Sequence, residues 1–272
     1  MAGFAVEDMF LKAAAASVPV GQVMVIFGFG GVLCFAALAL ASGEALFPPA
    51  ARSPSLWVRT VFEITGRLFY TLAFVLTPLS SATAILQATP IVVVAGAAMM
   101  FGETVGWRRW SAILVGLGGV LVIIRPGAEA FSPLSLLAVL GMIGFAGRDL
   151  ATRAAPAGLG TYTLGVYGFA AIVVAGLGYG AWTGEGALLP DRTAMAALGG
   201  AILFGVAAYT ALTHAMRTGE VSAVTPFRYT RLLFGVALGI LVFGERPDAA
   251  TVVGSAIVVA SGLFILFRSR QS

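Results

Sequence analysis

Charged side chains interrupt the long apolar stretches of this sequence at eight positions. Moving one such charge to the centre of a membrane costs about 2.5–3.5 kcal/mol on insertion scales. Residues that carry this cost usually pair with one another or face a polar interior. The eight sum to zero formal charge, and they are Glu7, Asp8, Glu63, Arg67, Arg148, Asp149, Arg228 and Arg231.

Two arginines stand three residues apart on one predicted helix. Arg228 and Arg231 share a helix face, and no acid of that helix lies within one turn of both. Two neighbouring guanidinium groups favour an anion, and arginine binds a carboxylate with two parallel hydrogen bonds. We therefore predict a carboxylate site there, with Glu7 or Glu63 holding an ammonium group. The alternative is that Glu7 or Glu63, from neighbouring helices, only neutralises the two arginines.

The remaining charges predict contacts along single helices. Glu63 and Arg67 are four residues apart, and Tyr70 continues their face, so we expect either an internal ion pair or a cavity wall. Adjacent helical residues point about 100° apart. We therefore expect Asp149 to turn away from Arg148.

Repeated pairs with four-residue spacing complete this set. Asp149 is expected to pair with Arg153, as Asp8 is with Lys12.

Four uncharged or weakly basic side chains add candidates for substrate binding. Gln87 is polar at depth, and His214, the one histidine of the sequence, is also a candidate for relaying a proton. Tyr167 and Tyr209 offer aromatic walls. Packing or a hydrogen bond to a neighbouring helix is the alternative role for each of the four.

The composition indicates that these helices lie in a lipid bilayer. Of the 272 residues, 59% are hydrophobic and 10% charged, with a mean hydropathy of +0.98; soluble domains are about 25% charged. Lipid offers no partner for a free backbone group, so the apolar segments must be helices. One cysteine and one histidine rule out a metal cluster that needs several of either. We expect no cofactor and no enzyme activity.

Ten apolar segments are long enough to predict helices. The connecting stretches are short and leave no room for a domain outside the membrane. The predicted spans are 1–16, 20–41, 57–77, 79–101, 108–124, 133–154, 160–182, 194–216, 221–243 and 249–267.

Two separate matches reveal an internal repeat. Residues 1–14 and 142–155 are identical at seven of fourteen positions, and Phe-Gly-Glu recurs at 101–103 and 243–245. Five helices per copy is an odd number, so the copies must have opposite orientations in the membrane. We predict an all-α membrane protein with repeats at 1–124 and 131–267 around a central cavity. The apolar lead-in at 131–141 has no counterpart before Met1, so we expect a short first helix.

Basic residues set the predicted orientation. With the N-terminus inside, eight arginines, among them Arg59, fall at inner ends, and four basic residues, among them Lys12, fall at outer ends. We expect a multi-pass protein of a bacterial inner membrane, with both termini in the cytoplasm.

The two repeats, their FAVEDMFLK and FAGRDLATR starts and the two FGE helix ends resemble the drug/metabolite transporter superfamily, and within it the EamA-type exporters. The resemblance implies a basket of ten helices in which the spans 108–124 and 249–267 are peripheral. It also implies export of amino acids, especially aromatic ones, or of other small metabolites.

We therefore predict a secondary transporter that exports such solutes by alternating access. Its partners are a small-molecule substrate and the lipid bilayer, with no nucleic acid. Export of cationic or aromatic drugs is the alternative, with Glu7, Asp8 and Glu63 attracting the cation. A channel is a further alternative, although no filter-like motif is present.

Overall fold

A computed structural model describes residues 1–101, 107–125, 132–154, 156, 158–218 and 221–269; side chains at 97, 101, 108–109, 113, 216–218, 221–230, 262 and 265–269 are left out of the description. These residues form helices and contain no strand, as predicted. The elements are α1 (Ala2–Ala14), α2 (Val20–Ala41), the 3₁₀ turn η1 (Pro49–Arg52), α3 (Pro54–Leu76), α4 (Leu79–Leu86), α5 (Thr89–Phe101), α6 (Trp107–Ile124), α7 (Ser135–Arg153), α8 (Thr161–Thr183), α9 (Arg192–Thr218), α10 (Val221–Phe243) and α11 (Ala249–Ser269).

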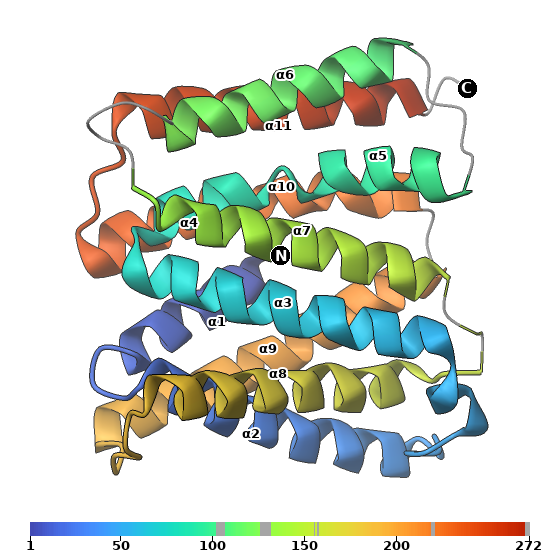
Figure 1. Cartoon of the computed structure of the whole chain (residues 1–272), viewed down its shortest axis with the longest axis vertical. Helices are drawn as coiled ribbons and strands as arrows, with labels where there is room; N and C mark the ends of the chain where they lie inside the picture. Colours follow the sequence, from blue (N-terminus) through green and yellow to red (C-terminus); the bar gives the residue numbers. More distant parts are fainter. Residues whose placement is uncertain (102–106, 126–131, 155, 157, 219–220, 270–272) are drawn as a thin grey trace.

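The helices lie side by side and alternate in direction, so the bundle has two ends (Figure 1). At one end α1, α3 and α10 finish and α4, α7 and α11 begin; we call it the Glu245 end. At the opposite end α3 begins and α7 and α9 finish; we call it the Arg59 end. Among the described residues, five segments are long and apolar enough to cross a membrane, namely Val20–Ala41, Leu79–Met100, Ser135–Arg153, Thr161–Thr183 and Arg192–Ala215.

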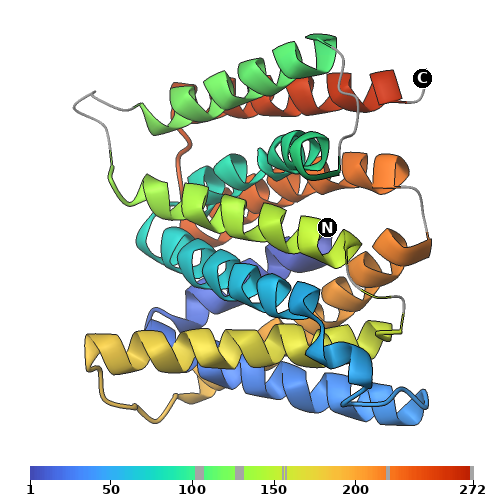
Figure 2. The same ribbon diagram turned by 45° about the vertical axis from the view of Figure 1, so that its right-hand side comes forward.

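The packing of helices follows the predicted repeat. We align the first five elements, α1, α2, α3, α4–α5 and α6, with α7, α8, α9, α10 and α11, in that order. Each major contact between helices then has a counterpart in which the two repeats are exchanged. α3 packs on α7 as α9 packs on α1, and α2 packs on α8. α6 and α11 pack mainly on each other and lie together at one edge of the bundle (Figures 1 and 2). This arrangement agrees with the peripheral position that the resemblance implied for 108–124 and 249–267.

Glycines let the central helices approach closely. A Cβ atom added to Gly144 of α7 would lie 2.3 Å from the backbone nitrogen of Gly66 on α3. Any side chain there would push the two helices apart. Since α3 and α7 carry most of the interior charges, this contact fixes the geometry of the site.

The predicted helix 79–101 is broken, which corrects the sequence-based interpretation. α4 ends at Leu86 and α5 begins at Thr89. Pro90 lacks the N–H that would bond to the carbonyl of Leu86, and its ring clashes with that carbonyl. The Thr89 hydroxyl donates to the Leu86 carbonyl instead, at 2.5 Å. The break places Gln87 between two half-helices inside the bundle.

The first helix is short, as expected. α1 has 13 residues against 19 in α7, its repeat counterpart. At 1.5 Å per residue it extends about 20 Å, less than the roughly 30 Å of a bilayer core. Figure 1 places its start within the outline of the bundle, between the two ends.

Candidate functional site

A cavity lies at the centre of the described helices, beside the break between α4 and α5. Three arginines line it, Arg67 from α3, Arg148 from α7 and Arg231 from α10. None of its described lining residues is acidic. Its volume is about 50 Å³, and one water needs roughly 10–15 Å³, so in this conformation it has room for a few waters and not for a whole metabolite.

The rest of the cavity wall combines rings, aliphatic groups and two uncharged polar side chains. Gln87 and Thr89 line it from the helix break. The guanidinium carbon of Arg148 lies 4.8 Å from the ring centroid of Phe145. The apolar lining also includes Phe4, Leu86, Pro90 and Leu212. The wall therefore offers cationic donors, neutral acceptors and apolar surface.

Behind two of the arginines stand the neighbouring acids of α1. Nη1 of Arg67 donates to Oε1 of Glu7 at 2.6 Å, and Nη2 of Arg231 donates to Oδ2 of Asp8 at 2.5 Å. The hydroxyl of Tyr70 donates to the same Oδ2 at 3.2 Å. Glu7 and Asp8 are both fully buried. α1 thus neutralises the wall from behind, and the guanidinium groups lie between its carboxylates and the cavity.

These contacts correct two predicted partners. Asp8 was expected to pair with Lys12 but binds Arg231, and Lys12 pairs with Glu245 at 3.0 Å. Of the two alternatives for Glu63 and Arg67, the internal ion pair is wrong, because Arg67 binds Glu7 instead and lines the cavity. A spacing of four residues shows only which side chains are neighbours on one helix. Here α1 packs against α3 and α10, and this packing brings partners from other helices closer.

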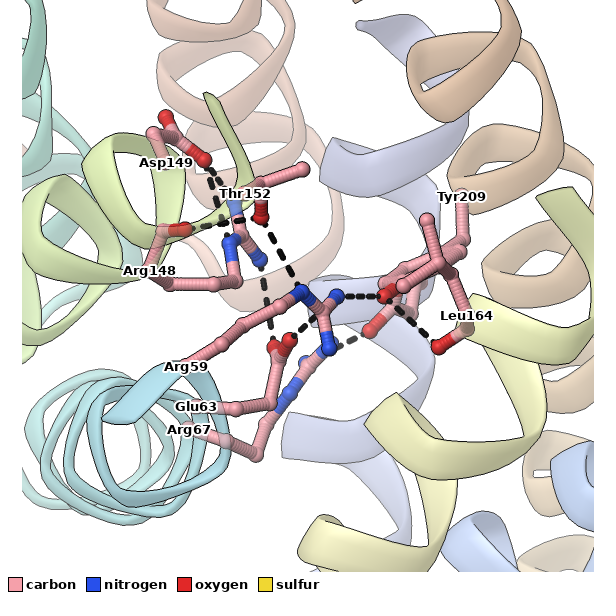
Figure 3. Close-up of polar contacts among 9 residues, drawn as sticks. Arg59, Glu63, Arg67, Arg148, Asp149, Thr152, Leu164 and Tyr209 are labelled. Atoms are coloured by element: carbon pink, nitrogen blue, oxygen red, sulfur yellow. Dashed lines mark hydrogen bonds and ion pairs between the residues drawn. The ribbon is translucent and has the colours of Figure 1, made fainter. Parts of the chain in front are cut away.

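Glu63 belongs to a second cluster of charges, on the Arg59 side of the cavity (Figure 3). Its Oε2 accepts from Nη2 of Arg59 and its Oε1 from Nη1 of Arg148, each at 3.2 Å. Arg148 also turns to its chain neighbour: Nη2 and Nε donate to Oδ1 of Asp149 at 2.9 and 3.1 Å. The expectation that Asp149 and Arg148 point apart is therefore wrong. The Cβ atoms of the two residues point in different directions, but the long arginine side chain bends back far enough to reach the neighbouring carboxylate. The contact between Asp149 and Arg153 stays a prediction.

Arg59 joins this cluster to α9. Its Nη2 donates to the hydroxyl of Tyr209, which donates to the carbonyl of Leu164 at 3.3 Å. Its Nε donates to Oγ1 of Thr152 at 3.0 Å. Arg59 was assigned from the sequence to an inner loop end, and its place in the site was missed. Its spacing of four residues from Glu63 was the available signal.

A second, smaller cavity lies within this cluster; we call it the Arg59 cavity. Its volume is about 30 Å³, and it shares Arg148 and Leu212 with the central cavity. The other residues that line it are Arg59, Asp149, Thr152, Tyr209 and Thr213.

The remaining predicted site residues lie apart from one another. Gln87 is buried and lines the central cavity. Tyr167 packs against a separate small apolar cluster at the Arg59 end, around Leu56, Leu159 and Leu164. His214 has an exposed side chain on α9 and is not among the residues lining either cavity. Arg228 falls in α10, but its side chain is outside the described residues, so its role stays a prediction.

At the Glu245 end, one carboxylate ties three elements together. Oε1 of Glu245 accepts from the backbone N–H of Leu79 at 2.6 Å and from Lys12. Its Oε2 accepts from the N–H and hydroxyl of Ser80 at 3.0 and 2.8 Å. Lys12 also donates to the carbonyl of Thr77 at 2.9 Å. We call these residues the Glu245 latch. Partial burial opposes the charge of Glu245, but the hydrogen bonds from Ser80 and Leu79 outweigh it and lower its pKa.

Comparison with known proteins agrees with this architecture. A crystal structure aligns at a TM-score of 0.66, with 21% identity, over 99% of this chain and 96% of the other. The chain is 27% identical to the S-adenosylmethionine uptake transporter of Rickettsia bellii (strain RML369-C), over 79% of this chain and 73% of that protein. It is 28% identical to the pseudopaline exporter CntI of Pseudomonas aeruginosa (strain UCBPP-PA14), over 95% and 90%.

A third relative and a family model complete the comparison. Identity is 26% to the riboflavin transporter of Rhizobium johnstonii (strain DSM 114642 / LMG 32736 / 3841), over 76% of this chain and 68% of that protein. The model of the EamA-like transporter family matches residues 1–125 and 133–267, nearly the whole chain. The chain therefore belongs to the EamA-like transporter family, and it is a multi-pass membrane transporter of small molecules.

Proposed function

We propose that this transporter exports amino acids, including aromatic ones, or similar small metabolites by alternating access. The observation that carries the proposal is the lining of the central cavity by Arg67, Arg148 and Arg231 with no described acid among its lining residues. Guanidinium groups in a dry interior favour a carboxylate, which they bind with charge-assisted hydrogen bonds. This assigns the anionic end of the substrate to the cavity wall.

The described side-chain charges of the site, which do not include Arg228, support a substrate without net charge. Among the described residues, the interior arginines Arg59, Arg67, Arg148 and Arg231 are matched in number by Glu7, Asp8, Glu63 and Asp149. A zwitterion leaves this balance unchanged, whereas a net charge adds an uncompensated one to a low-dielectric interior.

The other substrate groups have matching surfaces in the cavity. Glu7 and Glu63 stand behind guanidinium groups, so we assign the ammonium group to the neutral polar side chains that line the cavity, Gln87 and Thr89. Phe4, Phe145 and Leu212 offer apolar surface for a side chain. An aromatic or aliphatic amino acid matches the chemistry of this lining, and the surrounding helices have to separate to admit it, since the cavity is only about 50 Å³ in this conformation.

The direction and orientation of transport belong to the same proposal. The pseudopaline exporter is similar over 95% of this chain, and the excess of arginine at the Arg59 end favours a cytoplasmic position for that end and for both termini. The protein would lie in the inner membrane of a bacterium. The substrate would enter from the Arg59 end and leave at the Glu245 end.

Counterflow in proteoliposomes tests the proposal. Vesicles loaded with unlabelled amino acids are given labelled phenylalanine, threonine or a flat organic cation, with and without a pH gradient. Arg231→Gln alone leaves the fully buried Asp8 unpaired, so the informative variant is Asp8→Asn/Arg231→Gln. Its matched control is Asp248→Asn/Arg125→Gln, which removes a surface ion pair of the same chain.

We expect the wild type and the control to accumulate phenylalanine and the buried double variant to lose at least about tenfold in rate, because a hydrogen bond to a charged group is worth about 1.5–3 kcal/mol. Normal phenylalanine transport by the buried double variant would reduce Arg231 to a partner of Asp8. Uptake of the cation alone would favour drug export. Insensitivity to the pH gradient would indicate facilitated transport.

A further inference from the structure

We infer that the chain has a second carboxylate-binding site, at the Arg59 cavity, which takes the carboxylate of the substrate on its way between the central cavity and the Arg59 end, once the helices around this small cavity separate. This inference rests on the proposed function, because it takes the same amino-acid substrate. It adds a binding step that the central cavity alone does not require.

The first observation is the incomplete pairing of Arg59. Nε is bound to Thr152, and Nη2 is shared between Glu63 and the Tyr209 hydroxyl. Nη1 is buried and has no hydrogen-bond partner, although the whole side chain is only 4% exposed. A buried charged donor without an acceptor is costly. A carboxylate oxygen that comes within reach of Nη1 when the helices around the cavity separate would supply one.

The second observation is the order of the two cavities. Arg67 lines the central cavity and Arg59 lines the other, and their Cα atoms are eight residues apart on α3, or about 12 Å. Arg148 lines both cavities and is joined to Arg59 through Glu63 in the cluster of Figure 3. A carboxylate could move from Arg67 to Arg59 while remaining beside a guanidinium group throughout.

The third observation is the charge around the second cavity. Arg59 and Arg148 meet Glu63 and Asp149, and Arg148 already contacts both acids. These four charges cancel, so a zwitterion enters the Arg59 cavity without disturbing the balance. The hydroxyl groups of Thr152, Thr213 and Tyr209 add uncharged polar partners.

Equilibrium binding of labelled phenylalanine to the purified full chain in lipid nanodiscs tests the inference. We expect two sites per wild-type chain, a tighter central one and a weaker one. Arg59→Gln leaves Glu63 bound by Arg148, so no buried acid is orphaned. It should weaken the second site by about 10- to 100-fold and leave the affinity of the first unchanged.

Two further variants make the outcome specific. Arg52→Gln removes an exposed arginine at the same end, and both sites should remain. Arg59→Lys keeps the charge without the planar fork, so it should weaken the second site less than Arg59→Gln does. The unchanged first site shows that each variant is folded.

A single site per wild-type chain, or two intact sites in Arg59→Gln, would overturn the inference. A failure of the proposed function looks different. In that case phenylalanine does not bind the wild type, or Asp8→Asn/Arg231→Gln binds it normally at the first site.

Discussion

The Glu245 latch and the interior arginine clusters both contain ion pairs, but they differ in how many of their polar atoms have hydrogen-bond partners. The Glu245 carboxylate receives four hydrogen bonds, two of them from backbone N–H groups at the start of α4. In the interior, Oε2 of Glu7, Oδ1 of Asp8, Nη1 of Arg59 and Nε of Arg67 are buried without a hydrogen-bond partner.

This difference in hydrogen bonding distinguishes a cluster that holds helices together from a cluster that can bind a ligand. A carboxylate whose two oxygens already accept hydrogen bonds holds helix ends together and has no free acceptor position for a solute. Buried charges with unused hydrogen-bonding atoms carry a cost that a polar ligand relieves. At the Glu245 end the latch joins α1, α4 and the end of α10, whereas the unused hydrogen-bonding atoms belong to the interior ion pairs.

The largest effect is expected from breaking an interior pair. Arg67→Gln leaves Glu7 fully buried without its counter-charge, which should destabilise the fold by about 3–5 kcal/mol. The double variant Glu7→Gln/Arg67→Gln should recover most of this loss, because it removes both charges together. Thermal unfolding in detergent measures both. Equal destabilisation in the single and double variants would show that the ion pair itself, rather than the orphaned acid, determines stability.

A smaller effect is expected from the latch. Glu245→Gln removes a charged acceptor of four hydrogen bonds, of which the amide can keep some, so we expect a loss of about 1.5–3 kcal/mol in the same unfolding measurement. We also expect faster labelling of a cysteine placed at Ser81, which lines a pocket beside Glu245 at that end. Labelling at the wild-type rate would contradict the closing role of the latch.

The latch also predicts a pH dependence. The pKa of Glu245 is lowered in the folded state, so its stabilisation is complete above its unfolded pKa of about 4.5 and is lost as the pH falls through the lower folded value. The difference in unfolding temperature between wild type and Glu245→Gln should therefore shrink when the pH is lowered from 7 toward 3. A constant difference would mean that the carboxylate charge does not stabilise the latch.

The smallest effect is expected at the exposed pair beside the latch. Asp248 pairs with Arg125, and the side chains are 44% and 35% exposed. Its Oδ1 also accepts from the N–H of Thr251 at the start of α11, at 2.8 Å. Asp248→Asn keeps a good helix cap and loses a solvent-screened charge, so unfolding should change by less than about 1 kcal/mol. If Asp248→Asn lowered the stability as much as Glu245→Gln does, the exposed pair and the latch would not differ in their contribution to folding.

Much of the fold follows from local sequence. Apolar lengths predicted ten spans, and the repeated motifs predicted their exchange symmetry. The break at Gln87 was missed, although Pro90 was visible, because hydropathy alone does not register a missing backbone donor.

The candidate site was predicted as a set of charges but not as a set of pairs. Net neutrality indicated that the interior acids and arginines would meet. Which acid meets which arginine depends on the helix packing that brings Asp8 to Arg231 and Glu63 to Arg148, and no spacing along one helix reports this.

The most direct test of a carboxylate site at the arginine-lined cavity is competition against phenylalanine counterflow by two analogues, each lacking one charge. Phenylpropionate keeps the carboxylate, and phenethylamine keeps the ammonium group. We predict that phenylpropionate inhibits wild-type counterflow and that phenethylamine inhibits it at least about tenfold more weakly, with the preference lost in Asp8→Asn/Arg231→Gln. Stronger inhibition by phenethylamine would contradict the account, because the acids behind the arginines would then be the groups that bind substrate.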